Sequence, residues 1–197
     1  MKRVTVAVFG LACVMASAWA LRAQQAPGDG PRYTNETNLV RPTDYREWTF
    51  LGSGLGMTYE PAAGSQSAPQ FFTNVFVNPS SYRSFMQTGA WPDRTVFVLE
   101  ARASGSEASI NKAGRFQTNL VALEAEVKDS RFPDGWAFFD FGTARSMKDV
   151  AEPLSGNRVA GCVECHTKHT AVERTFVQFY PTLLEVARQK GTLKPGF

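Results

Sequence analysis

Cysteine and histidine are scarce in this 197-residue chain, which has three cysteines and two histidines. Cys13 lies in the apolar N-terminal segment, so only Cys162 and Cys165 remain in the rest of the sequence. A single pair cannot form the disulfide framework that stabilises many small secreted domains. A structural zinc site needs about four ligands, and besides the segment around this pair only His169 and scattered carboxylates are available. The sequence therefore favours neither a disulfide scaffold nor a zinc protein.

An excess of one charge is also missing. The chain carries 21 basic and 18 acidic residues, a formal net charge of +3. We find no cluster of lysine and arginine of the kind that binds a phosphate backbone. We therefore expect no nucleic-acid partner.

The N-terminus has the pattern of an export signal. Two basic residues after Met1 precede an uncharged apolar run over residues 4–16, which is shorter than the roughly 20 residues of a membrane-spanning helix. Ala18 and Ala20 are the small side chains that a signal peptidase accepts near its cleavage site. We expect residues 1–20 to be a signal peptide and the mature protein to be periplasmic.

The remaining sequence predicts one domain after a short leader. Residues 21–41 are polar, rich in Gln, Gly, Pro and Asn, and without periodicity, so we interpret them as a flexible leader. Residues 42–197 form the domain. Runs of β-branched and aromatic residues predict four strands in it, over 71–77, 95–103, 118–128 and 136–141. Short connections between successive strands favour antiparallel pairing.

Helices are predicted from proline at the first turn and glycine at the end. Pro79 and Gly89 delimit one helix, and Pro181 and Gly191 delimit another. A short helix is also expected from Thr43 or Asp44, ended by the glycines at 52, 54 and 56. The fold class is therefore α+β, an antiparallel β-sheet with flanking helices at both ends of the domain.

The motif that carries chemistry is Cys-x-x-Cys-His, formed by Cys162, Cys165 and His166. In this motif the two thiols bind the edge of a c-type haem and the adjacent histidine ligates the iron. A thioredoxin-like redox pair would instead follow a strand at the start of a βαβ unit, which this sequence does not indicate. We predict one covalent haem c near the C-terminus, attached to Cys162 and Cys165, with His166 as the proximal iron ligand.

The other axial ligand has few candidates. His169 follows His166 by three residues on the same expected helix, so it lies on the same side of the haem. Outside the signal segment the methionines are Met57, Met86 and Met147, and none follows the motif. We favour an open, five-coordinate haem with a small-molecule ligand at the iron. The alternative is a six-coordinate electron-transfer cytochrome c with a methionine distal ligand.

A series of short motifs runs in order through residues 42–180. They are Tyr45-Arg46-x-Trp48, Trp91-Pro92-Asp93-x-Thr95-Val96-Phe97-Val98-x-Glu100, Val127-Lys128-Asp129, Gly135-Trp136, Cys162 to His166, and Thr175-Phe176-Val177. In order and spacing they resemble the cytochrome P-460 family, which includes the cytochromes c′-beta. The resemblance implies a β-sheet fold with a five-coordinate haem c. It also implies hydroxylamine oxidation, or nitric oxide and carbon monoxide binding, with another cytochrome as electron acceptor, and it admits a homodimer.

The resemblance also assigns two positions beside the haem. Hydroxylamine-oxidising members carry a lysine cross-linked to the porphyrin, and our alignment places Leu99 there, with no lysine from Thr95 to Ser109. A carboxylate above the haem corresponds to Glu124, or less favourably to Glu126, and would act as the catalytic proton acceptor.

An apolar distal wall is the alternative to this carboxylate. It would consist of Phe97 and Leu99 on one strand face, with Phe138 or Phe139 beyond. Whether the protein is an enzyme therefore stays open. A carboxylate favours proton-coupled oxidation of hydroxylamine or nitric oxide, whereas an apolar wall favours binding and release.

Overall fold

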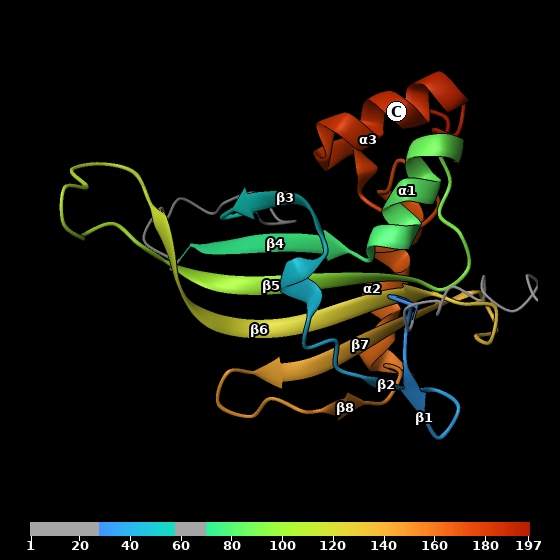
Figure 1. The fold of residues 1–197 in the computed structure, drawn as a ribbon, viewed down its shortest axis with the longest axis horizontal. Coiled ribbons are helices and arrows are strands. Elements are labelled where there is room, and N and C mark those ends of the chain that lie inside the picture. Colours follow the sequence, from blue (N-terminus) through green and yellow to red (C-terminus); the bar gives the residue numbers. More distant parts are fainter. Residues whose placement is uncertain (1–27, 58–69) are drawn as a thin grey trace, which may run out of the picture.

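A computed structural model describes residues 28–57 and 70–197 and has the expected α+β class. Its larger sheet has five strands in the order β3-β4-β5-β6-β7, all antiparallel to their neighbours. The strands are β3 (Thr49–Leu55), β4 (Phe71–Val77), β5 (Thr95–Gly105), β6 (Phe116–Lys128) and β7 (Trp136–Thr143). The sheet order follows the chain order, and the helix α1 (Pro79–Thr88) is inserted between β4 and β5 (Figure 1).

The four predicted strands are confirmed. β4 has the predicted bounds, whereas β5 ends two residues later than expected and β6 begins two residues earlier. These extensions pair with each other, since Gly105 lies opposite Phe116 and Ser104 opposite Gln117. Backbone pairing within a hairpin therefore continues beyond the hydrophobic pattern from which the strands were predicted.

The short helix expected from Thr43 or Asp44 is largely wrong. Only a single 3-10 turn, Tyr45–Glu47, is present, and Thr49 already begins the edge strand β3. β3 forms because its backbone groups pair with β4, from Thr49 opposite Val77 onward. Gly52 does not end a helix; a Cβ at this position would lie 3.2 Å from the Tyr180 ring, so glycine permits that close approach.

The expectation of a flexible leader is wrong for residues 28–41. This segment contains β1 (Tyr33–Thr34) and β2 (Asn38–Val40), which form a second antiparallel sheet with β8 (Val150–Ala151). Leu39 is fully buried, so this sheet adds a side chain to the core. Residues 1–20, where the signal peptide is expected, and 21–27 lie outside the described residues.

The helix signals at proline and glycine are confirmed. α1 ends at Gly89 and α3 (Pro181–Lys190) ends at Gly191, both with the left-handed backbone that glycine adopts readily. α1 and α3 pack against each other beside one end of the sheet (Figure 1). The remaining α-helix, α2 (Asn157–Lys168), lies between them in sequence and contains the Cys-x-x-Cys-His motif. In the described part of the chain, no helix is long and apolar enough to cross a membrane.

The large sheet has a separate hydrophobic cluster on each face, because side chains alternate along its strands. One cluster contains alternate residues of β5 and β6, covered by the small sheet and the 3-10 turn; these residues include Val96, Val98, Leu123, Ala125 and Val127. The other cluster joins Val77 and Phe97 to α1, α3 and residues 171–177. The rest of this second face lines the cavity beside α2.

Candidate haem site

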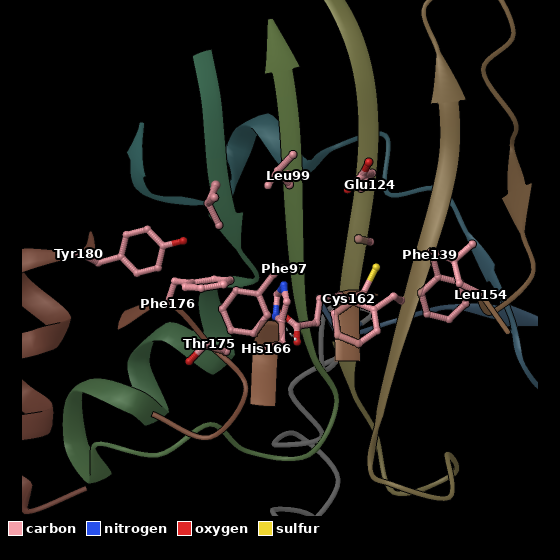
Figure 2. Close-up of a pocket in the computed structure, with 14 residues that line it drawn as sticks. Phe97, Leu99, Glu124, Phe139, Leu154, Cys162, His166, Thr175, Phe176 and Tyr180 are labelled. Carbon is pink, nitrogen blue, oxygen red and sulfur yellow. Dashed lines mark hydrogen bonds and ion pairs between the residues drawn. The ribbon is translucent and has the colours of Figure 1, made fainter. Parts of the chain in front are cut away.

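A cavity of about 140 Å³ lies between the sheet and α2. Its wall combines four neighbouring strands with α2, Leu154 and the segment that leads into α3 (Figure 2). The lining side chains are mainly apolar, and the ionisable ones are two glutamates, a cysteine, a histidine and a tyrosine; the full lining is Val75, Phe97, Leu99, Glu124, Ala125, Glu126, Phe138, Phe139, Leu154, Cys162, His166, Thr175, Phe176 and Tyr180.

The His166 ring is held in one tautomer. Its Nδ1 lies 2.8 Å from the main-chain oxygen of Arg174 and 3.1 Å from Oε1 of Glu126. A carbonyl oxygen can only accept a hydrogen bond, so Nδ1 carries the proton. Nε2 then keeps its lone pair, which is the form in which an imidazole binds iron. Phe138 and Phe176 contact the ring edge-to-face on either side, at 4.9 and 4.8 Å between centroids.

His166 and Glu126 influence each other's pKa. Burial alone would lower the pKa of His166, but the hydrogen bond and charge of Glu126 more than offset it, so its pKa is raised. Burial also raises the pKa of Glu126, and its hydrogen bond to His166 opposes that rise. The carboxylate of Glu126 therefore stabilises positive charge on the imidazole through the Nδ1–H.

Cys162 and Cys165 are free thiols, and both are partly exposed. On α2 they lie three residues apart, and His166 follows Cys162 by four residues, so the three side chains share one face of the helix. Cys162 lines the cavity, whereas Cys165 does not. In the described part of the chain, no three His, Cys, Asp or Glu side chains are grouped as metal ligands. Two thiols beside an apolar cavity and a single imidazole with a free Nε2 fit a c-type haem.

Six of the sheet residues that line the cavity belong to two cross-strand rows, whose other two members, Val77 and Asp140, do not line it. We call Val75, Leu99, Glu124 and Asp140 the outer row and Val77, Phe97, Glu126 and Phe138 the inner row, because the members of each row lie opposite one another on β4 to β7. His166 contacts the inner row. The outer row lies two residues further along, about 7 Å away, and Figure 2 shows Leu99 and Glu124 beyond the ring in this direction.

A comparison with protein families identifies the family of the chain. The sequence profile of the cytochrome P-460 family matches residues 42–177, from the 3-10 turn to the Phe176 segment. The chain belongs to the cytochrome P-460 family. No curated protein matches it. Family membership confirms the predicted resemblance and supports haem c as the cofactor.

The two positions assigned through the P-460 resemblance lie side by side. Leu99 on β5 and Glu124 on β6 are direct cross-strand partners. Glu124 reaches solvent through the cavity, yet burial by the surrounding protein raises its pKa, and the neighbouring carboxylate of Asp140 adds to the rise. Glu126, the less favoured carboxylate, is instead hydrogen-bonded to His166.

A second cavity of about 450 Å³ adjoins the first and shares Leu99, Glu124 and Phe176 with it. It leads toward Met57 at the end of β3, whose side chain is 48% exposed. A Cβ at Gly54 would overlap Met57 Sδ, so this glycine allows the methionine to lie over the strand. Met86 and Met147 pack instead against the two hydrophobic clusters.

His169 lies outside the cavities, whereas the aromatic candidates for the distal wall line the first cavity or contact His166. His169 is exposed at the C-terminal end of α2 and does not line either cavity. Phe97 and Leu99 both line the first cavity, but Phe97 belongs to the inner row, which His166 contacts. Phe138 contacts the His166 ring, whereas Phe139 belongs mainly to the opposite hydrophobic cluster.

Several groups at the site were not predicted. The Arg174 carbonyl could not be identified from sequence, since every residue has such an oxygen. Tyr180 and Leu154 also line the cavity without a sequence signal that we recognised. Phe176 belongs to the Thr175-Phe176-Val177 motif, so the family resemblance was the one available indication of it.

Most of the other P-460 motifs join the strands and the segment that surround the cavity. Tyr45 and Arg46, from the first motif, donate hydrogen bonds to Glu100 in the second. Trp91 Nε1 donates to Thr175 Oγ1 at 2.8 Å and so joins the second motif to the last. The motifs therefore fix the positions of the strands and of the segment that supplies the Arg174 carbonyl.

Proposed function

We propose that this protein is an exported mono-haem cytochrome c that binds or oxidises a small nitrogenous molecule, nitric oxide or hydroxylamine. Its haem is attached through Cys162 and Cys165, near the C-terminus, and His166 is the proximal iron ligand. The observation that carries the proposal is the His166 ring, whose Nδ1–H is held by the Arg174 carbonyl at 2.8 Å so that Nε2 is free for iron. Family membership supports the cofactor.

The haem supplies the metal centre at which such a ligand binds and its electrons are transferred. The described lining of the first cavity has no methionine and no second histidine, so it offers neither a thioether nor a second imidazole to a haem iron. Val75 and Leu99 give the outer row an apolar surface beside Glu124. Glu124, in the same row, is the acidic group placed to accept a proton that an oxidised substrate releases. Another cytochrome would accept the electrons.

Leu99 favours ligand binding over efficient hydroxylamine oxidation. Its side chain has no nucleophile, so it cannot form the porphyrin cross-link that the resemblance associates with the oxidising members. We expect an ordinary c-type haem spectrum and weak or absent hydroxylamine oxidation. Glu124→Gln should then leave nitric oxide binding intact, whereas any residual hydroxylamine oxidation should fall by about 100-fold or more.

The attachment is tested on the purified protein by acidified-organic extraction and intact mass. We expect the haem to stay with the polypeptide and to add the mass of one haem. The double variant Cys162→Ala/Cys165→Ala should lose the haem on extraction. Retention of haem by that variant would overturn the assignment. His166→Ala should keep the thioether bonds but lose normal iron ligation, because attachment and ligation use different atoms.

The open coordination position is tested by spectra of the reduced protein with and without carbon monoxide or nitric oxide. A five-coordinate, high-spin spectrum that changes on adding either gas supports the proposal. A low-spin spectrum that ignores carbon monoxide would contradict it.

The second candidate is a six-coordinate electron carrier, and Met57 is the observation in its favour. It is the only methionine of the described residues that lines either of the two adjoining cavities. If Met57 ligates the iron, Met57→Leu should convert a low-spin spectrum to a high-spin one. Met147→Leu is the matched control, since Met147 packs against the opposite hydrophobic cluster.

Export and assembly are part of the same proposal. The signal pattern of residues 1–20 supports a periplasmic protein whose mature chain begins at Leu21. N-terminal sequencing of the protein from a periplasmic fraction tests this. Sedimentation of the mature protein tests the homodimer that the family resemblance admits.

A further inference from the structure

We propose that Glu126 is a positioning residue that shares the Nδ1–H of His166 with the Arg174 carbonyl and thereby lowers the reduction potential of the haem iron. The inference rests on the proposed ligation of iron by Nε2 of His166. It concerns Nδ1 on the other side of the ring, which contacts Glu126 and the Arg174 carbonyl.

The hydrogen-bond geometry at Nδ1 requires two acceptors for one proton. The Arg174 oxygen at 2.8 Å is a main-chain carbonyl and cannot donate. Glu126 Oε1 at 3.1 Å therefore also accepts from the same N–H. A shared hydrogen bond of this kind holds the ring in one orientation and, through the carboxylate charge, is stronger than a bond to the carbonyl alone.

The hydrogen bond to His166 is the main interaction that stabilises the Glu126 carboxylate. Its side chain is 10% exposed, and its cross-strand neighbours are Phe97 and Phe138. Within the described residues, its hydrogen bond to His166 is the one that the side chain makes. A buried carboxylate with a single partner is costly to desolvate. The charge of Glu126 therefore acts mainly on the imidazole.

Two other charged side chains influence this pair. The Arg174 guanidinium favours the carboxylate form of Glu126, whereas Glu173 opposes it. Glu173 is itself paired with Lys128, whose Nζ lies 2.6 Å from Glu173 Oε2. Glu126 is consequently the negative charge in direct contact with the ring, and Glu173 is a nearby negative charge without that contact.

A carboxylate at the outer nitrogen makes a metal-bound imidazole more basic. A more basic imidazole donates more charge to the metal and stabilises the oxidised iron relative to the reduced iron. Removing the Glu126 charge should therefore raise the reduction potential. Outer hydrogen-bond partners typically change metal affinity by about 10-fold or more. A tenfold difference between the two oxidation states corresponds to about 59 mV for a one-electron couple.

The test uses the purified haem-containing protein and two variants of Glu126. Redox potentiometry gives the midpoint potential, and resonance Raman spectroscopy of the reduced protein gives the iron–histidine stretching frequency. Glu126→Gln keeps an acceptor without the charge, and Glu126→Leu removes both. We expect the potential to rise by about 59 mV in Glu126→Gln, and the stretching frequency to fall in the order wild type, Gln, Leu.

Glu173→Gln is the matched control because it removes one negative charge near His166 without touching Nδ1. We expect it to shift the potential by less than half as much. Equal shifts in both glutamine variants would show a general charge effect and overturn the proposal, as would an unchanged potential in Glu126→Gln. If Glu126→Leu does not fold, the glutamine variants decide the matter. Absence of covalent haem in the wild type would instead refute the proposed function.

Discussion

Replacing Glu100 with glutamine should destabilise the protein by about 2–3 kcal/mol at pH 7. Glu100 is 1% exposed and lies on the face of β5 opposite Leu99. Four side chains donate hydrogen bonds to its two oxygens. They are Tyr45 and Arg46 from the 3-10 turn, Asn74 from β4 at 3.0 Å, and Arg102 from β5 at 2.6 Å. The carboxylate therefore joins three elements behind the cavity wall.

The expected loss of stability follows from the hydrogen bonds that a glutamine amide can still make in place of the Glu100 carboxylate. Glutamine keeps one acceptor oxygen, but its NH2 group faces the two donors that the other oxygen served. Hydrogen bonds to a charged group contribute about 1.5–3 kcal/mol each. The Arg46 side chain is 53% exposed, so water can solvate its guanidinium when the ion pair is lost. This solvation limits the contribution of Arg46 to the loss of stability. Glu100→Ala should cost more, about 3–5 kcal/mol, because all four donors lose their acceptor.

The same carboxylate should make stability depend on pH. Burial alone would raise the pKa of Glu100, but hydrogen bonds from Tyr45, Arg102 and Asn74 more than offset it, so its pKa is lowered from 4.5. Between the two values the unfolded chain binds more protons than the folded one, so stability falls as the pH falls. The contribution of Glu100 is complete above pH 4.5 and is lost below it, toward its lower folded pKa.

Guanidinium denaturation followed by circular dichroism between pH 7 and pH 3 measures both effects. Glu100→Gln should lower the free energy of unfolding at pH 7 and should flatten its decline at acid pH. Glu47→Gln, at an exposed position of the same 3-10 turn, is the control and should change neither. A loss below about 1 kcal/mol at pH 7, or an acid decline as steep as in the wild type, would refute the reasoning.

Three further predictions concern the cavity and its support. Trp91→Phe should cost about 2 kcal/mol in the same denaturation assay, because the ring is buried and its Nε1–H bond to Thr175 is lost; a cost near zero would contradict the role given to this bond. Glu124 has a raised pKa, so wild-type stability should fall as the pH rises through that pKa, and Glu124→Gln should abolish this fall. Peptide mapping should give one haem peptide, with Cys162 and Cys165; a second peptide joined through a lysine would show that the inference from Leu99 is wrong.

Elements whose signals lie within a few residues could be predicted from the sequence. Pro79 and Gly89 delimit α1, and Pro181 and Gly191 delimit α3, because the fixed φ of proline and the left-handed backbone of glycine act within a few residues. The strand β4 was predicted with its bounds, since six of its seven residues are β-branched or aromatic. The Cys-x-x-Cys-His motif is likewise contiguous, so its three residues could be identified without a fold.

Contacts between distant segments could not be predicted from local patterns. Residues 28–41 and 49–55 have weak local preferences, and they form strands because β8 and β4 offer backbone partners. The alternation along β6 placed Glu124 and Glu126 on one face, but it could not show where α2 would dock. His166 lies 40 residues from Glu126 in sequence, and its contact with that side chain separates the roles of the two glutamates. Such contacts depend on packing between elements, which no local pattern records.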